Sequence, residues 1–301
     1  MNALEKQSTG TQEALARLLR VYSVEVTSRD TASLESVVGL LRPGTEVFVA
    51  NLPKESADVL VQAARRLRDA GLEPVPHIVA RNIASRAALN DMLARLAGEA
   101  GVNRALVLAG DRDDPAGEFD AALQLIDTGA FPANGIGRIY ISSYPEGHPR
   151  IADDLLEQAR ADKLAAAARE GLDVTLVTQF VFEPELVSEF ARRLRQSGIT
   201  APLRVGVAGP AERGKLIKYA LRCGVGASLR ALRERSELAR NVMAGETPDD
   251  LLGEVALSQA DESSLGISGV HFFTFGDPAS SIRWAEGARN ARAAIAPTLS
   301  R

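Results

Sequence analysis

Short apolar runs alternate with amphipathic stretches along most of this sequence. The run TEVFVA (45–50) is typical of a buried strand, and the stretch 56–71 that follows it repeats its apolar residues at helical spacing. The same pairing occurs eight times. Strands are predicted at 21–26, 45–50, 73–79, 104–110, 136–142, 173–180, 202–208 and 266–275. Helices are predicted at 31–41, 56–71, 85–101, 117–127, 151–171, 183–198, 212–224 and 280–295.

This alternation of strands and helices predicts a parallel sheet built from right-handed crossovers. Eight units are the number that closes a (β/α)₈ TIM barrel. The alternative is an open doubly wound sheet, which more often has a glycine-rich turn after its first strand, whereas the turn here reads VTSRD. We therefore predict one barrel domain over 1–301, with 1–20 as an N-terminal helical extension and a helix-rich insert at about 227–262 before the last strand.

Composition narrows the classes of partner. The chain has 301 residues, of which 46% are hydrophobic, and its net charge is −4. Lysine and arginine are interleaved with acidic residues, so no basic face favours nucleic acid. The single cysteine, Cys223, excludes an internal disulfide and fits a reducing compartment. The first twenty residues lack the apolar block of a signal peptide, and no apolar run is long enough to span a membrane. We expect a cytoplasmic protein.

In such a barrel the chemistry is found where the strands end, at their C-terminal side. Polar residues occupy most of these ends, and all three histidines of the chain are among them. The residues are Glu25, Asn51, His77, Gly110, Asp111, Tyr144, Glu146, His148, Thr178, Gln179, His271 and Thr274. The sequence therefore predicts an active site at this mouth of the barrel.

Several of these residues also have a purely structural interpretation. Glu25 fits a solvated edge position, although a carboxylate on a barrel strand is costly to bury without a role. His77 fits a hydrogen-bonded core residue as well as a ligand contact, and Gly110–Asp111 fits a plain turn. Gln179 is harder to explain without a ligand, because a buried amide needs several hydrogen-bond partners. For His271 we favour a structural role inside the barrel.

Three attractive motifs are set aside. GPAERGKL (209–216) has the spacing of a phosphate-binding loop, but Leu216 stands where serine or threonine must hold magnesium. GVGAS (224–228) lacks the third glycine of a dinucleotide fingerprint. The histidines have no partner at metal-ligand spacing, and one cysteine cannot build a zinc site, so no metal site is predicted.

Four segments together carry a family resemblance. AGD (109–111), SYPEGHP (143–149), VTQFVF (177–182) and GVHFFTF (269–275) follow predicted strands four, five, six and eight in that order. The set resembles the methylenetetrahydrofolate reductases, and VPHIV (75–79) and Glu25 in the first strand extend the similarity over most of the chain. SYPEGHP and VTQFVF are the more specific segments.

The resemblance implies a barrel that binds FAD, takes hydride from NADH or NADPH, and reduces 5,10-methylenetetrahydrofolate to 5-methyltetrahydrofolate in one-carbon metabolism and methionine biosynthesis. It implies that Glu25 is the general acid for opening the folate ring, with the raised pKa of a partly dry carboxylate. It further implies that Asp111 lies near both flavin and folate, and that Gln179 hydrogen-bonds the folate. The implied FAD contacts are His77, Leu108, Gly110, Asp111, Phe119, Ser142, Tyr144, His148 and Lys163.

The sequence departs from the family pattern on the cofactor side. Ala109 stands where an arginine is usual, and the helix after the fifth strand lacks the usual Leu-Lys-x-Lys pattern. Two alternatives therefore stay open: a divergent relative that oxidises methyltetrahydrofolate in a demethylation pathway or works without flavin, and a non-catalytic barrel that binds folate or flavin. The sequence leaves open the choice between NADH and NADPH and whether the chain forms a homo-oligomer.

Overall fold

The computed structural model describes residues 3–53, 55–211, 213–223, 225 and 247–290. Eight parallel strands form a closed barrel in which each strand pairs with the next and the last pairs with the first. They are β1 (Tyr22–Thr27), β2 (Glu46–Ala50), β3 (Glu73–Val79), β4 (Arg104–Leu108), β5 (Arg138–Ser143), β6 (Asp173–Thr178), β7 (Leu203–Ala208) and β8 (Ile267–Phe273). The predicted (β/α)₈ barrel is confirmed.

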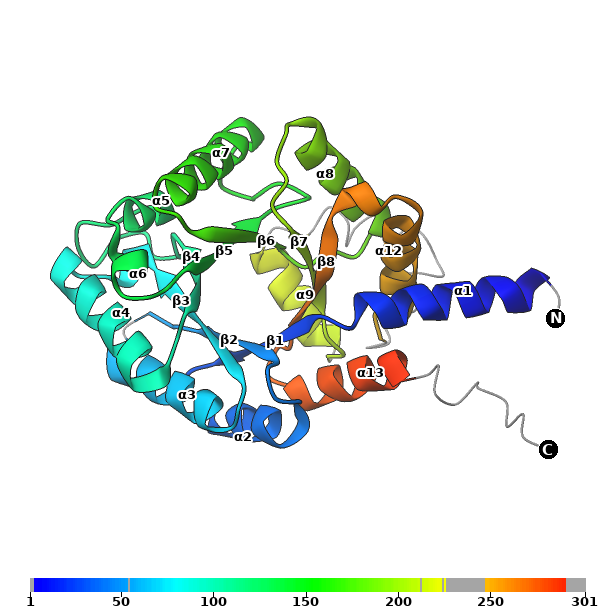
Figure 1. The fold of residues 1–301 in the computed structure, drawn as a ribbon, viewed down its shortest axis with the longest axis horizontal. Coiled ribbons are helices and arrows are strands. Elements are labelled where there is room, and N and C mark those ends of the chain that lie inside the picture. Colours follow the sequence, from blue (N-terminus) through cyan, green and yellow to red (C-terminus); the bar gives the residue numbers. More distant parts are fainter. Residues whose placement is uncertain (1–2, 54, 212, 224, 226–246, 291–301) are drawn as a thin grey trace.

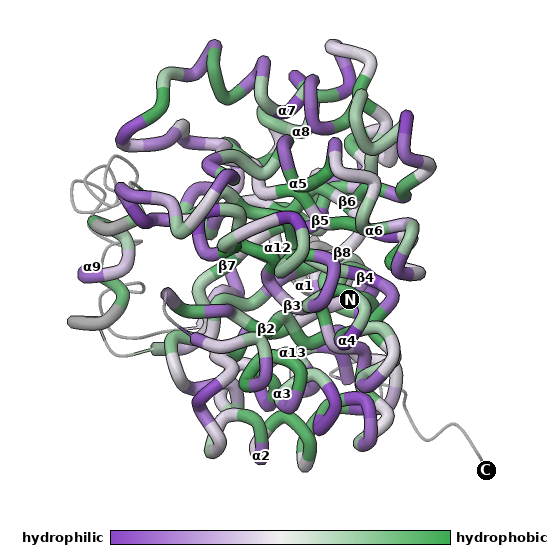
Figure 2. The backbone as a smooth tube through the Cα atoms, turned by 90° about the vertical axis from the view of Figure 1, so that its left-hand side faces the viewer, coloured by the Kyte–Doolittle hydropathy of each residue, from purple (hydrophilic) through white to green (hydrophobic). Residues whose placement is uncertain are grey.

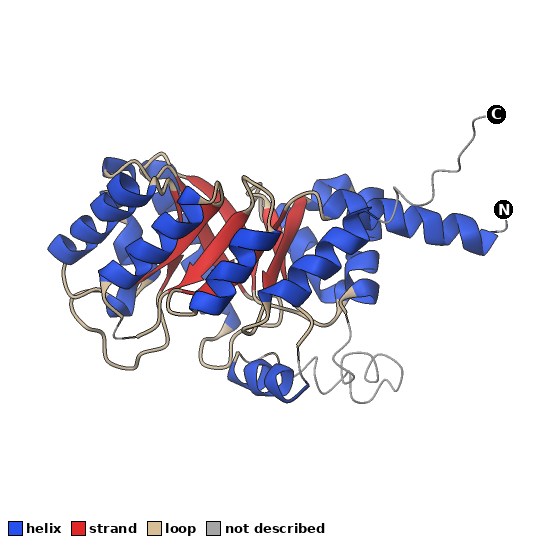
Figure 3. Cartoon of the chain, turned by 90° about the horizontal axis from the view of Figure 1, so that it is seen from below, coloured by secondary structure: helices blue, strands red, loops and turns tan. Residues whose placement is uncertain are grey.

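Helices surround the strands, as Figures 1 and 3 show. They are α1 (Ala3–Leu18), α2 (Thr31–Leu40), α3 (Ala57–Asp69), α4 (Arg86–Ala100), α5 (Ala122–Ile126), α6 (Ala130–Ala133), α7 (Asp153–Arg169), α8 (Pro184–Gln196), α9 (Arg213–Arg222), α12 (Asp249–Asp261) and α13 (Pro278–Asn290). Single 3₁₀ turns cover Ala80–Asn82 and Ser263–Leu265. No helix in the described part of the chain is long and apolar enough to cross a membrane.

The apolar faces of the helices pack on the outer face of the strands and form the main core. The strands at the centre of Figure 2 are accordingly more hydrophobic than the helices around them. α3 illustrates the pattern, because Leu60, Ala64 and Leu67 are fully buried at helical spacing while its arginines face outward. A second apolar cluster fills the inside of the barrel, where the rings of Phe48 and Tyr140 meet with centroids 4.9 Å apart.

One helix departs from the expected ring. α9, predicted as the outer helix after strand seven, packs instead against residues that follow the C-terminal ends of β6 and β8 (Figure 1). The Tyr219 ring lies 4.7 Å from that of Phe275, and Ala220 is buried in the same cluster as Phe180. α12 packs on the barrel surface between α8 and α1. The expected insert is therefore helical where the structure describes it, and its part at 226–246 lies outside the described residues.

The helix predicted at 117–127 is shorter than expected. The chain after β4 runs as a loop, and α5 begins only at Ala122. The loop packs closely at Gly117, where an added Cβ would lie 2.0 Å from the carbonyl oxygen of Ala84. Only glycine fits at this contact between the loop and the segment that follows β3.

A buried ionic network lies inside the barrel near the N-terminal ends of the strands. Oε1 of Glu46 accepts hydrogen bonds from Tyr140 at 2.5 Å and from Arg104 at 2.6 Å, while Oε2 pairs with Arg204. Burial alone would raise the pKa of Glu46, but Arg204 and the hydrogen bonds lower it to about 2. Glu46 is therefore ionised at neutral pH and fully paired.

Candidate active site

Glu25, His77 and His271 meet at the C-terminal mouth of the barrel. They come from β1, β3 and β8. Oε2 of Glu25 lies 3.4 Å from Nε2 of His77 and 3.7 Å from Nε2 of His271. Both imidazole rings are almost fully buried and pack against Phe48, whereas the Glu25 side chain keeps 24% of its surface exposed. The cluster thus presents one carboxylate to the mouth and holds it between two buried rings.

The charge states of this cluster follow from burial and proximity. Burial by itself would raise the pKa of Glu25, but the neighbouring His271 and His77 outweigh it and lower that pKa. Burial lowers the pKa of both histidines, although Glu25 acts in the opposite direction. At neutral pH the cluster therefore holds a carboxylate between two neutral imidazoles. The expectation of a raised pKa for Glu25 is wrong for the protein without ligands, because the sequence did not reveal its two histidine neighbours.

A chain of hydrogen bonds fixes the position of His271. Nη1 of Arg204 donates to Oγ of Ser23 at 3.2 Å, and that oxygen lies 2.9 Å from Nδ1 of His271. When the serine hydroxyl donates a hydrogen bond to Nδ1, the ring proton is on Nε2 and faces Glu25. Oγ1 of Thr274, the residue after β8, donates to the backbone carbonyl of Glu25 at 2.6 Å and so also anchors the backbone of the glutamate. His271 is therefore structural, as predicted, and also a direct neighbour of Glu25.

Three buried polar oxygens at this end of the barrel have no hydrogen-bond partner among the described residues: Oδ1 of Asn51, Oδ1 of Asn82 and Oγ of Ser143. Asn51 directly follows β2, Asn82 lies in the 3₁₀ turn after β3, and Ser143 ends β5. Unpaired buried polar groups are costly, so they suggest a polar ligand that completes their hydrogen bonds. Nε2 of His77 instead faces the carboxylate of Glu25 at 3.4 Å, so His77 is a direct neighbour of Glu25.

A cavity of about 340 Å³ lies at the same end of the barrel, where β3, β4 and β5 end. It is lined by Arg81, Leu108, Ala109, Gly110, Asp111, Tyr144, His148, Arg150 and Ile151. Gly110 has a φ of +97°, and a Cβ there would lie 2.4 Å from Cγ1 of Val79. Only glycine fits, so the chain turns sharply and brings the exposed Asp111 to the cavity. The structure thus brings together Leu108, Gly110, Asp111, Tyr144 and His148 from the predicted set.

Arg81 holds the loop after β4 in place. Its guanidinium donates to the carbonyl oxygens of Arg112, Asp113 and Asp120 at 2.7, 3.1 and 3.0 Å. The backbone carbonyl of Arg81 also accepts from the amide of Ala116 at 2.9 Å. One side chain therefore joins three points of a loop that lacks regular structure, and it fixes the wall of the cavity that carries Asp111.

The segment SYPEGHP forms the opposite wall. The hydroxyl of Tyr144 donates to Oγ of Ser142 at 3.2 Å, and its ring meets that of His148 edge to face at 5.2 Å. Nδ1 of His148 accepts from the backbone amide of Arg150 at 3.2 Å, so Nε2 is left to donate toward a ligand. The side chain of Arg150 is 61% exposed and pairs with Asp113 across the cavity entrance. The Tyr144–Ser142 bond thus joins two predicted cofactor contacts.

Gln179 lies next to this wall rather than in the cavity itself. The backbone amide of Gln179 donates to the backbone carbonyl of Ser143 at 2.8 Å, which ties the end of β6 to the end of β5. Its Oε1 accepts from the amide of Phe180 at 3.0 Å, so Nε2 is the atom with which it can donate to a ligand. Gln179 and Tyr144 both line a separate small cavity of about 10 Å³.

Four predicted cofactor contacts do not line this cavity: His77, Ser142, Phe119 and Lys163. Ser142 is bonded to Tyr144 in the wall and His77 lies beside Glu25, whereas the other two are placed elsewhere. Phe119 is 4% exposed and belongs to the main apolar core. Lys163 lies in α7, where burial and the nearby Arg160 lower its pKa to about 8. Neither residue lines the cavity described above. Their assignment to FAD therefore stays a prediction.

Sequence reasoning assigns no role to four polar residues at this end of the barrel. Arg81 and Arg150 line the cavity, and Asn51 and Ser143 carry buried oxygens without a partner among the described residues. From sequence, Asn51 is identified only as the end of strand two. A signal existed for Arg81, which comes two residues after the end of β3, but a single arginine after a strand is too common to single out.

A comparison with known families agrees with this geometry. The family described as Methylenetetrahydrofolate reductase matches residues 51–226, more than half of the chain. The matched region runs from the end of β2 past α9 and includes His77, Asp111, Tyr144 and Gln179. Glu25 and His271 lie outside it and reach the same mouth through closure of the barrel.

Proposed function

The chain belongs to the methylenetetrahydrofolate reductase family, and we propose that it reduces 5,10-methylenetetrahydrofolate to 5-methyltetrahydrofolate with NADH or NADPH. The observation that carries the proposal is the cluster of Glu25, His77 and His271 at the same end of the barrel as the cavity that Asp111 lines. This end of the barrel thus combines a group that can exchange a proton with a second carboxylate. Opening a cyclic aminal and transferring hydride to the resulting cation need both features.

Glu25 is proposed as the proton donor to the nitrogen that leaves when the folate ring opens. In the free protein it is a carboxylate, because the two histidines lower its pKa. A bound folate covers the exposed quarter of this side chain and excludes water, which favours the protonated form. Once Glu25 has given up its proton, His77 and His271 would stabilise the carboxylate that remains. The three groups would therefore titrate as one unit.

Asp111 and Gln179 are proposed to orient and stabilise the substrate. The exposed carboxylate of Asp111 follows the sharp turn at Gly110, so it can approach a planar cation without rearrangement of the backbone. Its negative charge would stabilise the methylene iminium that forms when the ring opens. Nε2 of Gln179 would donate to the pterin, while its Oε1 is held by the amide of Phe180.

FAD is the proposed cofactor, and the residues at the cavity fit its ring system. Gly110 leaves room for close approach, Tyr144 and His148 supply aromatic edges, and Nε2 of His148 supplies a hydrogen-bond donor. Arg150 at the entrance would meet the diphosphate. When bound, FAD would carry hydride from the nicotinamide to the folate.

One observation favours a second reaction, direct hydride transfer from nicotinamide without flavin. Ala109 supplies no cation to the cavity, and Lys163 does not line it. The cations that line the cavity are Arg81, whose Nε and Nη1 already bind loop carbonyls, and Arg150, whose side chain is 61% exposed. The diphosphate of FAD would thus depend mainly on Arg150. The test is NADH- or NADPH-dependent formation of methyltetrahydrofolate by purified protein, with and without added FAD. Turnover that requires FAD supports the first reaction, turnover unaffected by FAD supports the second, and no turnover in either direction overturns both.

A further inference from the structure

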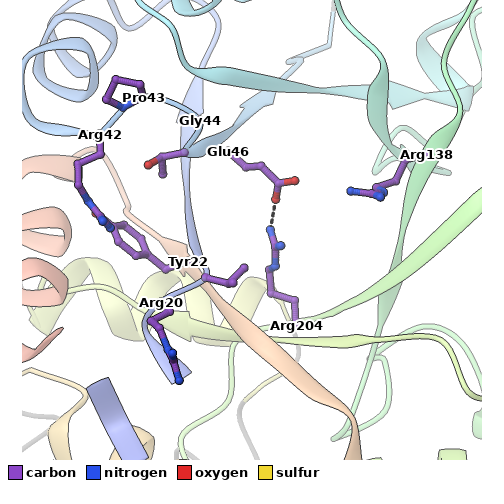
Figure 4. A pocket seen from close by; sticks show the side chains of 10 residues that line it. Arg20, Tyr22, Arg42, Pro43, Gly44, Glu46, Arg138 and Arg204 are labelled. Carbon is purple, nitrogen blue, oxygen red and sulfur yellow. Dashed lines mark hydrogen bonds and ion pairs between the residues drawn. The ribbon is translucent and has the colours of Figure 1, made fainter. Parts of the chain in front are cut away.

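A second cavity of about 360 Å³ lies at the opposite end of the barrel from the proposed active site. Its lining comes from the N-terminal ends of the strands, where Tyr22 begins β1, Glu46 begins β2 and Arg138 begins β5. In Figure 4, Arg42 and Arg138 lie on opposite sides of this cavity. The volume falls within the range of roughly 300–1,000 Å³ that is typical of small-molecule sites.

The lining of this cavity is strongly basic. Four arginines line it: Arg20, Arg42, Arg138 and Arg204. Glu46 is the single carboxylate among its lining residues. Glu46 cannot neutralise them all, because its two oxygens already accept from Arg204, from Tyr140 and from Arg104, which lies outside the lining. A chain with a net charge of −4 therefore gathers four arginines at one concave place, although Glu286 and Asp173, outside the lining, pair with Arg42 and Arg138.

These arginines do not serve the usual structural purpose of basic residues at this end of a barrel. Helices end here, and arginines often bind their last carbonyl groups. Arg68 does so through the carbonyls of Ala100 and Gly101, and Arg195 through those of Leu265, Ile199 and Ala201. Among the described residues, none of the four arginines that line the cavity donates a side-chain hydrogen bond to a backbone carbonyl. Their donors are thus not consumed by helix ends.

Their other contacts leave donors to spare. The side chain of Arg20 has no hydrogen bond or ion pair within the described residues, and that of Arg138 has only a 3.6 Å ion pair with the exposed Asp173. Arg42 uses Nε and Nη2 for Glu286, which leaves Nη1. Nε of Arg204 is buried and has no partner among the described residues.

We propose that this cavity, the basal arginine pocket, binds a small organic anion that carries at least two phosphate or carboxylate groups. Guanidinium groups match both chemistries through paired hydrogen bonds, and their spread around a concave surface suits a ligand with separated charges. Arg20 and Arg138 would bind it through exposed donors, with Arg42 contributing its remaining nitrogen. Arg204 would supply positive charge from the floor.

The test is isothermal titration calorimetry of the full-length protein with pyrophosphate and, separately, with citrate, at constant ionic strength set with sodium chloride. The two probes distinguish phosphate from carboxylate as the preferred group. We expect saturable binding of one equivalent of at least one probe. The double variant Arg20→Ala/Arg138→Ala should weaken it by about tenfold or more, because two charge-assisted contacts are lost.

Two controls keep the result specific. Arg192→Ala removes a similarly exposed arginine that is paired with Glu262 and does not line the pocket, and it should leave binding unchanged. Arg150→Ala removes the cation at the other mouth and should also leave binding unchanged. The proposal is overturned if neither probe binds saturably, if all variants weaken binding equally, or if Arg150→Ala alone removes it. Because this test measures binding away from the proposed active site, it stands or falls separately from the proposed function.

Discussion

Glu25 and His271, which lie at opposite ends of the chain, bring Oε2 and Nε2 to within 3.7 Å because β1 and β8 close the barrel. His271 in turn is held by Ser23, which lies on the same strand as Glu25 and is the register partner of His271 between β1 and β8. The contact couples the charge of a carboxylate at the mouth to a polar network in the barrel interior. It also sets the pKa on which the proposed chemistry depends.

Removal of His271 should change the titration of Glu25. His271 lowers the pKa of Glu25, so His271→Leu is expected to raise it, and His271→Gln, which keeps a donor, should raise it less. A group with a higher pKa stays protonated to higher pH. Infrared absorption of the protonated carboxyl, assigned by its absence in Glu25→Gln, measures this directly. A carboxyl band that titrates at the same pH in all His271 variants would contradict the coupling.

Glu46 should make stability depend on pH in the acid range. Its pKa is about 2 when folded against a usual value of 4.5, so its contribution is complete above about pH 4.5 and is lost as pH falls toward 2. The difference corresponds to about 3 kcal/mol. Glu46→Gln should therefore destabilise the protein strongly at pH 7 in urea unfolding, and the gap to wild type should narrow below pH 4. The exposed Glu35→Gln is the matched control, and an equal gap at pH 7 and pH 3 would speak against the assignment.

Gly110→Ala should damage both the fold and the cavity. Its φ of +97° and a Cβ 2.4 Å from Val79 force a shift of the loop that carries Asp111. We expect a loss of about 1–3 kcal/mol in the free energy of unfolding and weaker binding of FAD. Gly39→Ala, in α2 with nothing within 4 Å of the added Cβ, should lose no stability. If both variants unfold at the same temperature as wild type, the constraint at Gly110 is not real.

Arg81→Ala should loosen the loop over 109–121 without unfolding the barrel. Three carbonyl contacts are lost, so amides of this loop should exchange hydrogen faster, while those of β3 and β4 keep their protection. KM for the folate should rise more than kcat falls. Arg95→Ala, which removes surface ion pairs on α4, is the control. Unchanged exchange across the loop would remove Arg81 from this role.

Much of the architecture could be predicted from sequence because it depends on local periodicity. A buried strand such as 45–50 and an amphipathic helix such as 56–71 can each be recognised within a single segment. Eight strand–helix pairs of this kind suffice for a closed barrel. The placement of α9 was not predictable in this way. Its amphipathic pattern does not reveal that Tyr219 stacks on Phe275 rather than on the outside of β7.

The site was predictable in part for the same reason. Glu25, Asp111 and Gln179 were identified by their places at strand ends. The pKa of Glu25 was predicted in the wrong direction, because it depends on His77 and His271, which lie far away in sequence. Likewise, the arginines of the basal arginine pocket are scattered from position 20 to position 204, so charge patterning along the chain did not reveal them.

The central claim is that Glu25 donates the proton that opens the folate ring, and one measurement tests it most directly. Stopped-flow kinetics with Glu25→Gln follow two half-reactions separately: reduction of bound FAD by NADH, and its reoxidation by 5,10-methylenetetrahydrofolate. The amide is close in size to the carboxylate but cannot donate as an acid. The account predicts normal flavin reduction and a reoxidation rate lower by about 100-fold or more. Reoxidation at the wild-type rate would contradict it.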